Sequence, residues 1–449
     1  MLEFLTPNDP ALFAENDALT IQNAIAAAEK DGCRKLRIPR YNLRTKKNEW
    51  RIDRAIRIPS DFTVVLDNCY MVQETGIYDR MFTNANSNKP ENLTAEAEQH
   101  DITLIGEGNV ILDGGVHNHL LEKTTLRYGL PSVWMNTMIY WENVRNLRVE
   151  NLYIRNQRWW GITNLFCRDA VYKNIIFEAI PHVPNMDGID LRTGCNNFLI
   201  ENITGRTGDD TVAMTALNGK YEREHRVEGK DTHIHDVRVR NVISDPYTQF
   251  CVRVLNHGGN CAYNIDLDTI YDTSDYTTKR RPRCTVGVGS MRYFTGSKAE
   301  PHETRNITAK HMISRGEDCL RLDNCLSDST FTNVKTYGDN IVAIGTFFGG
   351  TRMENVTFDS VYYGTKQQEI FCSKDLSPEE YTGKVLNMFG NSSGNITIKN
   401  LVVDKVNTVF EVSGDLDVKV EGYACGCALK TAVLDGGKVT VDGEEIENG

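Results

Sequence analysis

The chain has 449 residues, enough for one large domain or several ordinary ones, and its 40% hydrophobic and 25% charged residues are typical of folded, soluble proteins. Its net charge of −11 argues against a nucleic-acid partner, because neutralising phosphates requires an excess of Lys and Arg on the binding face. No apolar run approaches the roughly 20 residues that span a bilayer, so we expect no membrane segment.

The N-terminal residues carry no basic segment followed by an apolar stretch and a small-residue cleavage site, so no secretory signal is predicted. The 12 cysteines are scattered and lack the paired C-x-x-C spacing of a zinc site. We expect most of them to be reduced and buried. These features favour a cytoplasmic enzyme, or an extracellular one if residues are missing from its start.

Residues 17–32, DALTIQNAIAAAEKDG, predict an amphipathic helix. Ile21, Ile25 and Ala28 recur at helical spacing, Asp17 is a possible N-cap, and Gly32 is a possible stop. A helix here would cover the open end of stacked sheets, which would otherwise expose unpaired backbone. We therefore assign residues 1–60 to an N-terminal cap region.

Short segments that begin with Asn repeat along the second part of the chain. In each of them the Asn precedes alternating, often β-branched residues, which predicts a short strand. They begin at Asn151, Asn174, Asn202, Asn241, Asn306, Asn333, Asn355 and Asn395. Each of the first six is followed, after a turn, by a second short strand. The shortest intervals, 22, 23, 27 and 28 residues, suit one coil of a right-handed parallel β-helix.

Two features favour stacked coils over a sandwich of hairpins. An Asn at a fixed position can form a ladder of side chains inside a turn, and Asn-Gly or Asp-Gly hairpin signals are mostly missing between the repeats. Strand-like sequence continues beyond residue 400 without a Pro- or Ser-rich linker. We predict an all-β fold, a single right-handed parallel β-helix domain over residues 1–449, with repeated coils from about residue 100 to 449 and a short N-terminal capping helix.

Three carboxylates stand in two neighbouring repeats: Asp187 in MDGIDL, and Asp209 and Asp210 in GDDTVAM. Because adjacent coils lie about 4.8 Å apart, equivalent positions would place Asp187 above Asp210, with Asp209 beside them. Like charges so close cannot all ionise freely, so one pKa should rise. Asp-Gly or Gly-Asp alone is typical of a turn. Three acids on one face instead favour an acid–base pair for hydrolysing a glycosidic bond.

The same residues resemble a known family. NMDGID followed by TGDDTVAM is similar to the N-T-D-G-x-D and G-D-D signatures of the polygalacturonases, glycoside hydrolase family 28. Weaker similarity covers residues 101–115 and 306–323. The resemblance, to a divergent member, implies a right-handed parallel β-helix and an inverting hydrolase with Asp209 as general acid. It further implies that Asp187 and Asp210 hold the nucleophilic water, that Arg321 binds substrate, and that no metal or cofactor takes part.

The sequence departs from the family pattern at several positions. The family's G-H-G histidine has no counterpart, because Cys284 stands at the aligned position, and His257 in NHGGN is a possible substitute or a structural residue. Asp323 replaces the lysine of the R-x-K motif, and Met186 replaces the Thr of N-T-D. The loss of the lysine bears most directly on substrate choice.

Strand alternation gives a possible replacement for that lysine. In CLRLDN, Leu320 and Leu322 are expected to face inward, which turns Arg321 outward, and the pattern of CVRVLN turns Arg253 outward as well. Two arginines on one face could clamp the carboxylate of a uronide. The alternative is surface charge balanced by Asp190 and Asp323.

Other candidate substrate-binding residues are Asp190, His182, His257 and Trp160. Trp160 could form a platform for a sugar ring, although a tryptophan at a coil edge is also typical of the core. The loops at residues 217–231 and 272–284 are long enough to wall one end of a cleft, which favours exo-action.

We therefore predict an exo-acting, inverting, polygalacturonase-like hydrolase whose partner is a pectin-like or related oligosaccharide. A calcium-dependent pectate-lyase or epimerase could use the same three carboxylates together with Arg321. A non-catalytic, β-helical carbohydrate-binding protein is a third possibility. The sugar, the linkage and the oligomeric state stay open.

Overall fold

The computed structural model describes residues 4–121, 129–180, 183–274, 284–289, 299–315, 318–337, 342–364 and 383–449. Contacts within the chain define two compact units. The first unit is Met1–Thr211 with Gly219–Thr232, and the second unit is Val212–Asn218 with His233–Gly449. A single domain over the whole chain stays a prediction.

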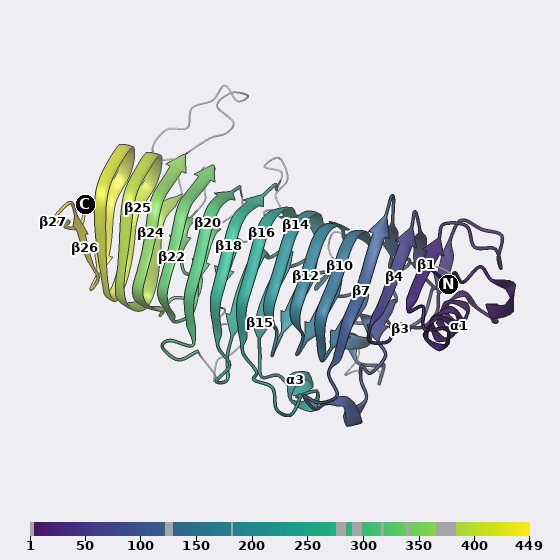
Figure 1. Ribbon diagram of the computed structural model, residues 1–449. Coiled ribbons are helices and arrows are strands. Elements are labelled where there is room, and N and C mark those ends of the chain that lie inside the picture. The colour runs from purple at the N-terminus through teal and green to yellow at the C-terminus, as the bar shows by residue number, and fades with distance from the viewer. Residues whose placement is uncertain are drawn as a thin grey trace, which may run out of the picture. The chain divides into compact units, whose positions relative to one another are not determined.

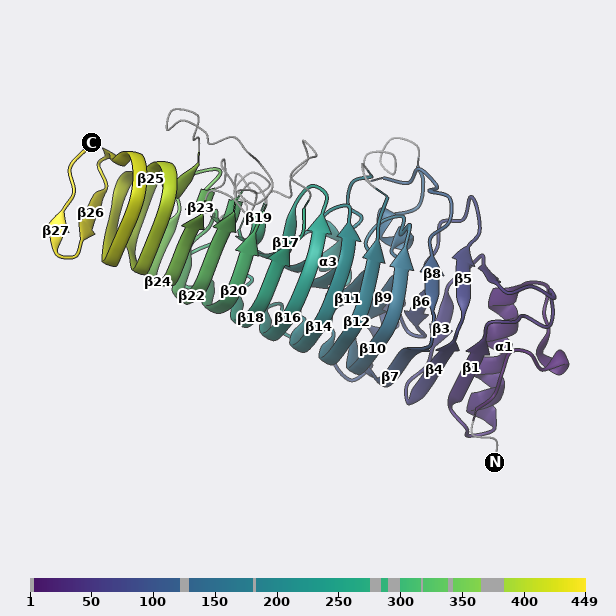
Figure 2. The same cartoon turned by 90° about the horizontal axis from the view of Figure 1, so that it is seen from above.

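The first unit begins with a helix that covers the earliest strands. Helix α1 (Asp17–Lys30) lies against strands β1 (Lys35–Pro39), β2 (Trp50–Ile52) and β3 (Ile56–Ile58) (Figures 1 and 2). Its side chains Ile21, Ile25 and Ala28 are fully buried or nearly so. The predicted amphipathic capping helix is therefore confirmed.

The cap of this helix differs from the prediction. Asn16, not Asp17, is the N-cap, and its side chain accepts a hydrogen bond from Leu19 N at 2.8 Å. The Asp17 carboxylate is buried, accepts a hydrogen bond from Arg51 N at 2.8 Å and pairs with Arg44. Asp17 therefore ties the helix to residues distant in sequence, a role that local sequence does not reveal.

The first unit is built from strands that stack in parallel columns. The strands are β1 (Lys35–Pro39), β2 (Trp50–Ile52), β3 (Ile56–Ile58), β4 (Phe62–Asp67), β5 (Tyr70–Gln73), β6 (Phe82–Asn84), β7 (Gln99–Glu107), β8 (Ile111–Asp113), β9 (Ile139–Glu142), β10 (Val144–Arg155), β11 (Ile162–Leu165), β12 (Arg168–Glu178), β13 (Ile189–Arg192) and β14 (Asn196–Thr207). One column runs β1–β4–β7–β10–β12–β14, a second runs β3–β6–β9–β11–β13, and a third runs β2–β5–β8–β10. Stacking begins at β1, earlier than the predicted boundary near residue 100. The sequence did not reveal these early strands because they are short and lack the Asn repeat.

The first unit also contains several short helices. They are η1 (Pro10–Leu12), η2 (Pro90–Asn92), η3 (Val133–Asn136) and α3 (Lys220–Glu224). None of the helices in the described ranges is both long and apolar enough to cross a membrane.

The second unit repeats the same architecture. Its strands are β15 (Val212–Ala216), β16 (Ile234–Pro246), β17 (Phe250–Asn256), β18 (Ala262–Asp272), β19 (Cys284–Val288), β20 (Thr304–Ser314), β21 (Asp318–Leu322), β22 (Leu326–Tyr337), β23 (Val342–Gly345), β24 (Arg352–Gly364), β25 (Lys384–Asp435), β26 (Lys438–Val441) and β27 (Glu444–Glu445). The columns β16–β18–β20–β22–β24–β25 and β15–β17–β19–β21–β23–β25 are parallel. The fold is the predicted all-β, right-handed parallel β-helix.

A ladder of Asn side chains lines one turn of the first unit. Asn174 Nδ2 donates to Asn151 Oδ1 at 2.9 Å, and Asn202 Nδ2 donates to Asn174 Oδ1 at 2.9 Å. All three residues have left-handed φ angles, 59°, 56° and 59° in chain order, which Asn tolerates better than most residues. The predicted Asn ladder is confirmed.

The eight repeated Asn residues belong to two different turns, which corrects the single alignment predicted from the sequence. Strand β22 contains both positions, because Asp328 begins one turn and Asn333 begins the other. Asn355 Nδ2 donates to Asp328 Oδ1 at 2.8 Å, the register aligns Asn306 with Asp328, and Asn395 Oδ1 accepts a hydrogen bond from Asn355 N at 3.1 Å. Both turns need a left-handed residue followed by alternating residues, so their sequences look alike.

Candidate active site

The structure brings Asp187, Asp209 and Asp210 together in the first unit. One carboxylate oxygen from each residue lies within 4.8 Å of those of the other two. Asp187 and Asp210 are 5% and 2% exposed, whereas Asp209 is only partly buried. The predicted grouping of the three carboxylates is confirmed, and their catalytic roles stay predictions.

Stacked backbone segments produce this grouping. Gly188 N donates to Asp210 O at 2.9 Å, and one coil earlier Gly161 N donates to Asp187 O at 3.0 Å. Because the same bond recurs in successive coils, Asp187 and Asp210 occupy equivalent positions, as predicted. Trp160, which precedes Gly161, holds this position in the coil before Asp187.

Gly188, which follows Asp187, allows neighbouring coils to approach closely. A Cβ atom at Gly188 would lie 2.4 Å from Thr211 O and 3.0 Å from the Phe177 ring. Gly188 is also not among the residues with a left-handed φ. The Asp-Gly pair is therefore not a left-handed turn, which was the competing interpretation of this dipeptide.

Two buried threonines fix the turn that carries the other two acids. Thr207 Oγ1 donates to Asp209 O at 2.8 Å, and the Thr207 and Thr211 hydroxyls lie 3.0 Å apart. Both side chains are fully buried. Asp210 N donates to Asp209 Oδ1 at 3.1 Å. The backbone around Asp209 is thus held from within its own turn.

A buried glutamine, Gln157, binds the backbone of the coil that carries Asp187. Gln157 Nε2 donates to Met186 O at 3.3 Å and to Asp187 O at 3.2 Å. The sequence did not predict Gln157, Thr207 or Thr211 as part of the site. Each is a common polar residue at a strand end, with no local pattern that marks it.

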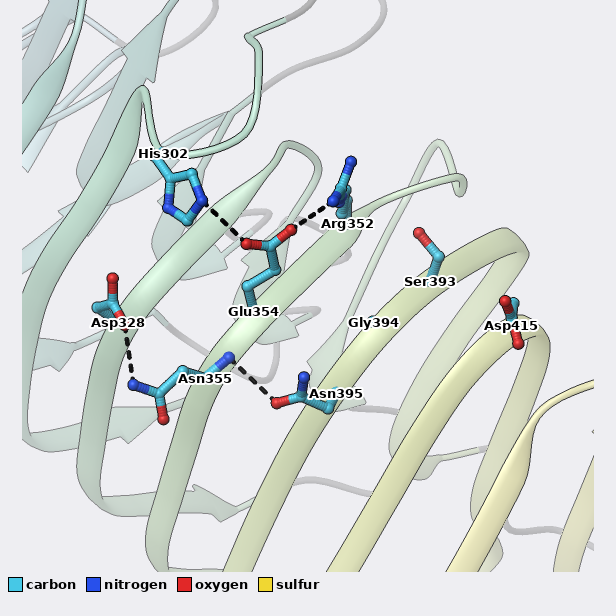
Figure 3. A pocket seen from close by; sticks show the side chains of 9 residues that line it. All are labelled: His302, Asp328, Arg352, Glu354, Asn355, Ser393, Gly394, Asn395 and Asp415. Carbon is cyan, nitrogen blue, oxygen red and sulfur yellow. Dashed lines mark hydrogen bonds and ion pairs between the residues drawn. The ribbon is translucent and has the colours of Figure 1, made fainter.

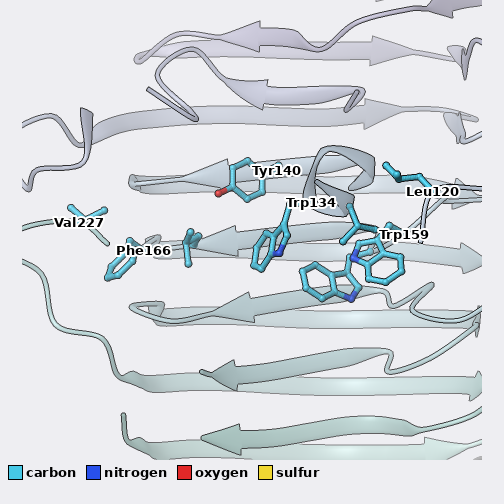
Figure 4. Close-up of a cluster of buried hydrophobic side chains, with 9 residues drawn as sticks. Leu120, Trp134, Tyr140, Trp159, Phe166 and Val227 are labelled. Carbon is cyan, nitrogen blue, oxygen red and sulfur yellow. The ribbon is translucent and has the colours of Figure 1, made fainter. Parts of the chain in front are cut away.

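Trp160 lies in an aromatic cluster of the first unit, where it is 7% exposed. Figure 4 shows Trp134, Tyr140, Trp159 and other members of this cluster over neighbouring strands. The Trp134 and Trp160 ring centroids are 4.8 Å apart at an interplanar angle of 89°. The structure thus favours the core interpretation of Trp160 over a sugar platform.

Residues 219–232, which we call the strap, pack against this cluster. The Tyr221 ring stacks on Trp134 with centroids 3.8 Å apart and an interplanar angle of 5°. Glu222 pairs with Arg192 of β13, and their side chains are 5% and 7% exposed. The Arg192 guanidinium lies 4.8 Å from the centre of the Trp160 ring. The strap therefore covers the part of the first unit next to the coil of Asp187.

Two more candidate residues precede Arg192 along the chain. Asp190 is 1% exposed in β13, and its carbonyl accepts a hydrogen bond from Asn164 Nδ2 at 3.1 Å. His182 lies outside the described residues. Substrate binding by Asp190 and His182 stays a prediction.

In the second unit, two arginines lie on the same face of the sheet, on the two strands that flank β19. Arg253 of β17 and Arg321 of β21 both align with Gly287 of β19, which lies between them. The Phe250 ring fills the space that a Gly287 side chain would take, and its centre lies 5.1 Å from Arg253 and 6.0 Å from Arg321. The predicted shared face of the two arginines is confirmed.

Arg321 is 3% exposed, so its outward direction does not place it on an open surface. Its Nε donates to Asp318 Oδ2 at 2.9 Å, and its guanidinium lies 4.4 Å from the centre of the Phe347 ring. Burial acts to lower the pKa of Arg321, but Asp318, Cys284 and Asp323 together outweigh burial and the pKa is raised. Among the described residues, the ion-pair partner of Arg321 is Asp318, whereas Asp323 acts on it only as a nearby charge.

Asp323, which replaces the family lysine, holds a turn. Its Oδ1 accepts hydrogen bonds from Thr346 Oγ1 at 2.7 Å, Phe347 N at 2.7 Å and Phe348 N at 3.1 Å. This turn carries Phe347, whose ring covers Arg321. The acid at this position thus has a structural partner within the second unit.

His257 is 9% exposed just after β17, and its backbone N donates to Ala216 O at 3.3 Å. Cys284, at the position expected for the family's histidine, is fully buried, and burial raises the pKa of its thiol. A catalytic role for His257 stays a prediction.

An open groove of about 580 Å³ lies in the second unit (Figure 3). The Glu354 carboxylate lies 3.1 Å from His302 Nε2 and 2.6 Å from Arg352, and Asn355 N donates to Asn395 at 3.1 Å. The groove contains none of the predicted site residues, so it does not add to the candidate active site.

Comparisons with known proteins agree with these features. Residues 54–230 match the sequence model of "Glycosyl hydrolases family 28". "Polygalacturonase QRT2" from Arabidopsis thaliana is 28% identical over 110 residues, which cover 24% of this chain and 25% of that protein. The chain thus matches about a quarter of the length of this curated relative.

Two solved structures share the fold. The Yersinia enterocolitica Family 28 Exopolygalacturonase has a TM-score of 0.54 at 13% identity, over 98% of this chain and 78% of that chain. The pre-mature gene product 12 of bacteriophage phi29 has a TM-score of 0.52 at 13% identity, over 99% of this chain and 57% of that chain. At such identities these likenesses show the fold alone.

Proposed function

We propose, from the match of residues 54–230 to glycosyl hydrolases family 28, that the protein hydrolyses glycosidic bonds of pectin-like oligosaccharides. The matched segment contains all three carboxylates of the candidate site. The observation that carries the proposal is their grouping, with oxygens within 4.8 Å of one another. A shared fold alone would not support it, because one fold can host unrelated functions.

The exposures of the three acids support the roles implied by the family resemblance. Asp209, the least buried of them, is the general acid that protonates the leaving oxygen. Asp187 and Asp210 hold the water that attacks the anomeric carbon. Like charges this close disfavour ionisation of all three carboxyl groups, which favours a protonated acid beside an ionised base.

We further propose that hydrolysis inverts the anomeric configuration. The oxygen spacing of at most 4.8 Å is shorter than the carboxyl separation of about 6.5–9.5 Å in most inverting enzymes and resembles the roughly 5 Å of retaining ones. Two features support inversion: the family resemblance and the presence of a third carboxylate. With three carboxylates, Asp187 and Asp210 can hold the water while Asp209 acts as the general acid.

A panel of oligogalacturonides and neutral oligosaccharides tests both proposals, with the product anomers followed by NMR from the start of the reaction. We expect cleavage of an oligogalacturonide and an initial product of opposite anomeric configuration. A product that first forms with the configuration of the substrate would rule out inversion. No cleavage of any sugar in the panel would argue against the hydrolase itself.

A calcium-dependent lyase is the second candidate, and the same grouping favours it. Three carboxylate oxygens within 4.8 Å of one another are the kind of ligands that Ca²⁺ prefers. A lyase would lose activity in EDTA and would form an unsaturated, ultraviolet-absorbing product. The hydrolase is expected to keep its activity in EDTA and to form saturated products.

We propose exo-action, supported by the strap. Trp160 occupies the position equivalent to Asp187 one coil earlier, and it is 7% exposed within the aromatic cluster, with the Arg192 guanidinium over its ring. The surface on that side of Asp187 is therefore filled, and a sugar chain would have to end there. Of the second predicted loop, residues 275–283 lie outside the described residues. A cytoplasmic location, where such an enzyme would meet short oligosaccharides, stays a prediction.

Loosening the strap is expected to change the length of the products. In the double variant Tyr221→Ala and Glu222→Gln, the strap loses its stack on Trp134 and its ion pair to Arg192. The wild type should release single sugars, whereas the variant should release several-fold more of the longer oligosaccharides in chromatographic analysis. Lys220→Ala is the control, because this strap side chain is 83% exposed. Identical product lengths in all three proteins would contradict the role of the strap.

A further inference from the structure

Gln157 binds the backbone on both sides of the Asp187 Cα atom. It follows β10, belongs to the coil before Asp187, and is 0% exposed. Its single amide nitrogen donates to two successive carbonyls, Met186 O at 3.3 Å and Asp187 O at 3.2 Å. The two peptide groups that flank the Asp187 Cα atom are thus bound to one side chain.

Each of these carbonyls also accepts a backbone hydrogen bond from a neighbouring coil. Met186 O accepts from Gly208 N at 2.9 Å, and Asp187 O accepts from Gly161 N at 3.0 Å. Gly208 directly precedes Asp209. The Met186 carbonyl therefore joins the Gln157 side chain, the Asp187 turn and the turn that carries the other two acids.

We propose that Gln157 is a positioning residue that sets the place of Asp187 relative to Asp209 and Asp210. The consequence for catalysis rests on the proposed hydrolase function. Without the amide, each of the two buried carbonyl oxygens would keep its backbone hydrogen bond but lose its second donor, which favours a backbone shift that recovers a second partner. A displacement of about 1 Å in a catalytic group can cost on the order of 100-fold in rate.

The acceptor atom of the Gln157 side chain, Oε1, makes substitution by Glu an informative test. Among the described residues, Gln157 Oε1 is buried and has no hydrogen-bond partner. The amide orientation is therefore set by its donor end. A protonated Glu at this position can donate one hydrogen bond toward the same carbonyls, whereas an ionised Glu can donate none and is repelled by both oxygens.

The first experiment removes the donor and keeps the bulk, in Gln157→Leu. We expect kcat on oligogalacturonides to fall by roughly 10- to 100-fold, with KM nearly unchanged, because the change affects the placement of the acids rather than substrate contacts. Gln73→Leu is the matched control. Gln73 is 2% exposed, and its Nε2 donates to Asp79 O at 2.8 Å, a carbonyl outside the candidate site.

The second experiment compares Gln157→Glu with the wild type across a range of pH. Because burial favours the protonated carboxyl, the variant should recover activity as the pH falls, so its kcat divided by that of the wild type should rise. A residue that only stabilises the fold would give a constant ratio at every pH at which both proteins stay folded.

A crystal structure of Gln157→Leu separates this proposal from the hydrolase function, because it needs no substrate. We expect the three carboxylates to move apart, beyond the 4.8 Å that groups them in the wild type. An unmoved group would overturn the positioning role, as would equal kcat losses in Gln157→Leu and Gln73→Leu. If the wild type cleaves no sugar, the function fails while the structural test of Gln157 still stands.

Discussion

Replacing Asp209 by Asn is expected to lower kcat for oligogalacturonide hydrolysis by about 10²- to 10⁴-fold, the usual contribution of a general acid. An amide has the shape of the carboxyl group but cannot transfer a proton to the leaving oxygen. Asp209 is the most exposed of the three acids, so the change should leave the fold intact. Steady-state kinetics, together with thermal unfolding, would measure both effects.

A carboxylate elsewhere in the first unit provides the control for Asp209. Asp169 lies in the other of the two turns, in register with Asn146 and Asn197, and its Oδ1 accepts a hydrogen bond from Asn197 Nδ2 at 2.6 Å. Asn occupies the same position in neighbouring coils, so Asp169→Asn should leave kcat unchanged. If Asp209→Asn retains wild-type kcat on every cleaved substrate, Asp209 is not the acid. If Asp209→Asn loses both sugar binding and stability, its role is structural.

Replacing Arg321 by Gln is expected to weaken kcat/KM on an acidic oligosaccharide by roughly 10- to 150-fold. A charge-assisted hydrogen bond to a carboxylate contributes about 1.5–3 kcal/mol, and each 1.4 kcal/mol corresponds to about a factor of ten. The methyl-esterified form of the same oligosaccharide carries no charge and should be affected far less. Competing the two substrates in one reaction gives the ratio of kcat/KM directly.

Gln is chosen for Arg321 because the arginine is buried and paired. Truncation to Ala would remove the buried ion pair with Asp318, and breaking such a pair can cost about 3–5 kcal/mol of stability. Gln can still donate a hydrogen bond to Asp318. Arg253→Gln should also lower kcat/KM more on the acidic than on the esterified substrate, but by a smaller factor. Arg253 matches no motif position of the family, and only strand parity and register align it with Arg321. Equal losses on the acidic and the esterified substrate would show that these arginines do not recognise a carboxylate.

The sequence by itself determined the features that repeat with the coil. Asp187 and Asp210 could be placed in equivalent positions because stacked strands keep residues one coil apart in register. Arg253 and Arg321 could be placed on one face because side chains alternate along a strand. The Asn ladder was predictable for a related reason, since a left-handed turn residue recurs in every coil.

Only the tertiary structure decided the features that depend on contacts between distant segments. The strap covers Trp160, Asp323 holds the turn of Phe347, and Gln157 reaches the carbonyls of Met186 and Asp187. None of these contacts has a period in the sequence, because each joins a loop or a single side chain to a coil about 25 or more residues away, where many polar residues would fit the local pattern equally well. The sequence repeat specifies the path of the backbone through the coils. Packing between distant segments specifies which side chains stay exposed to a substrate.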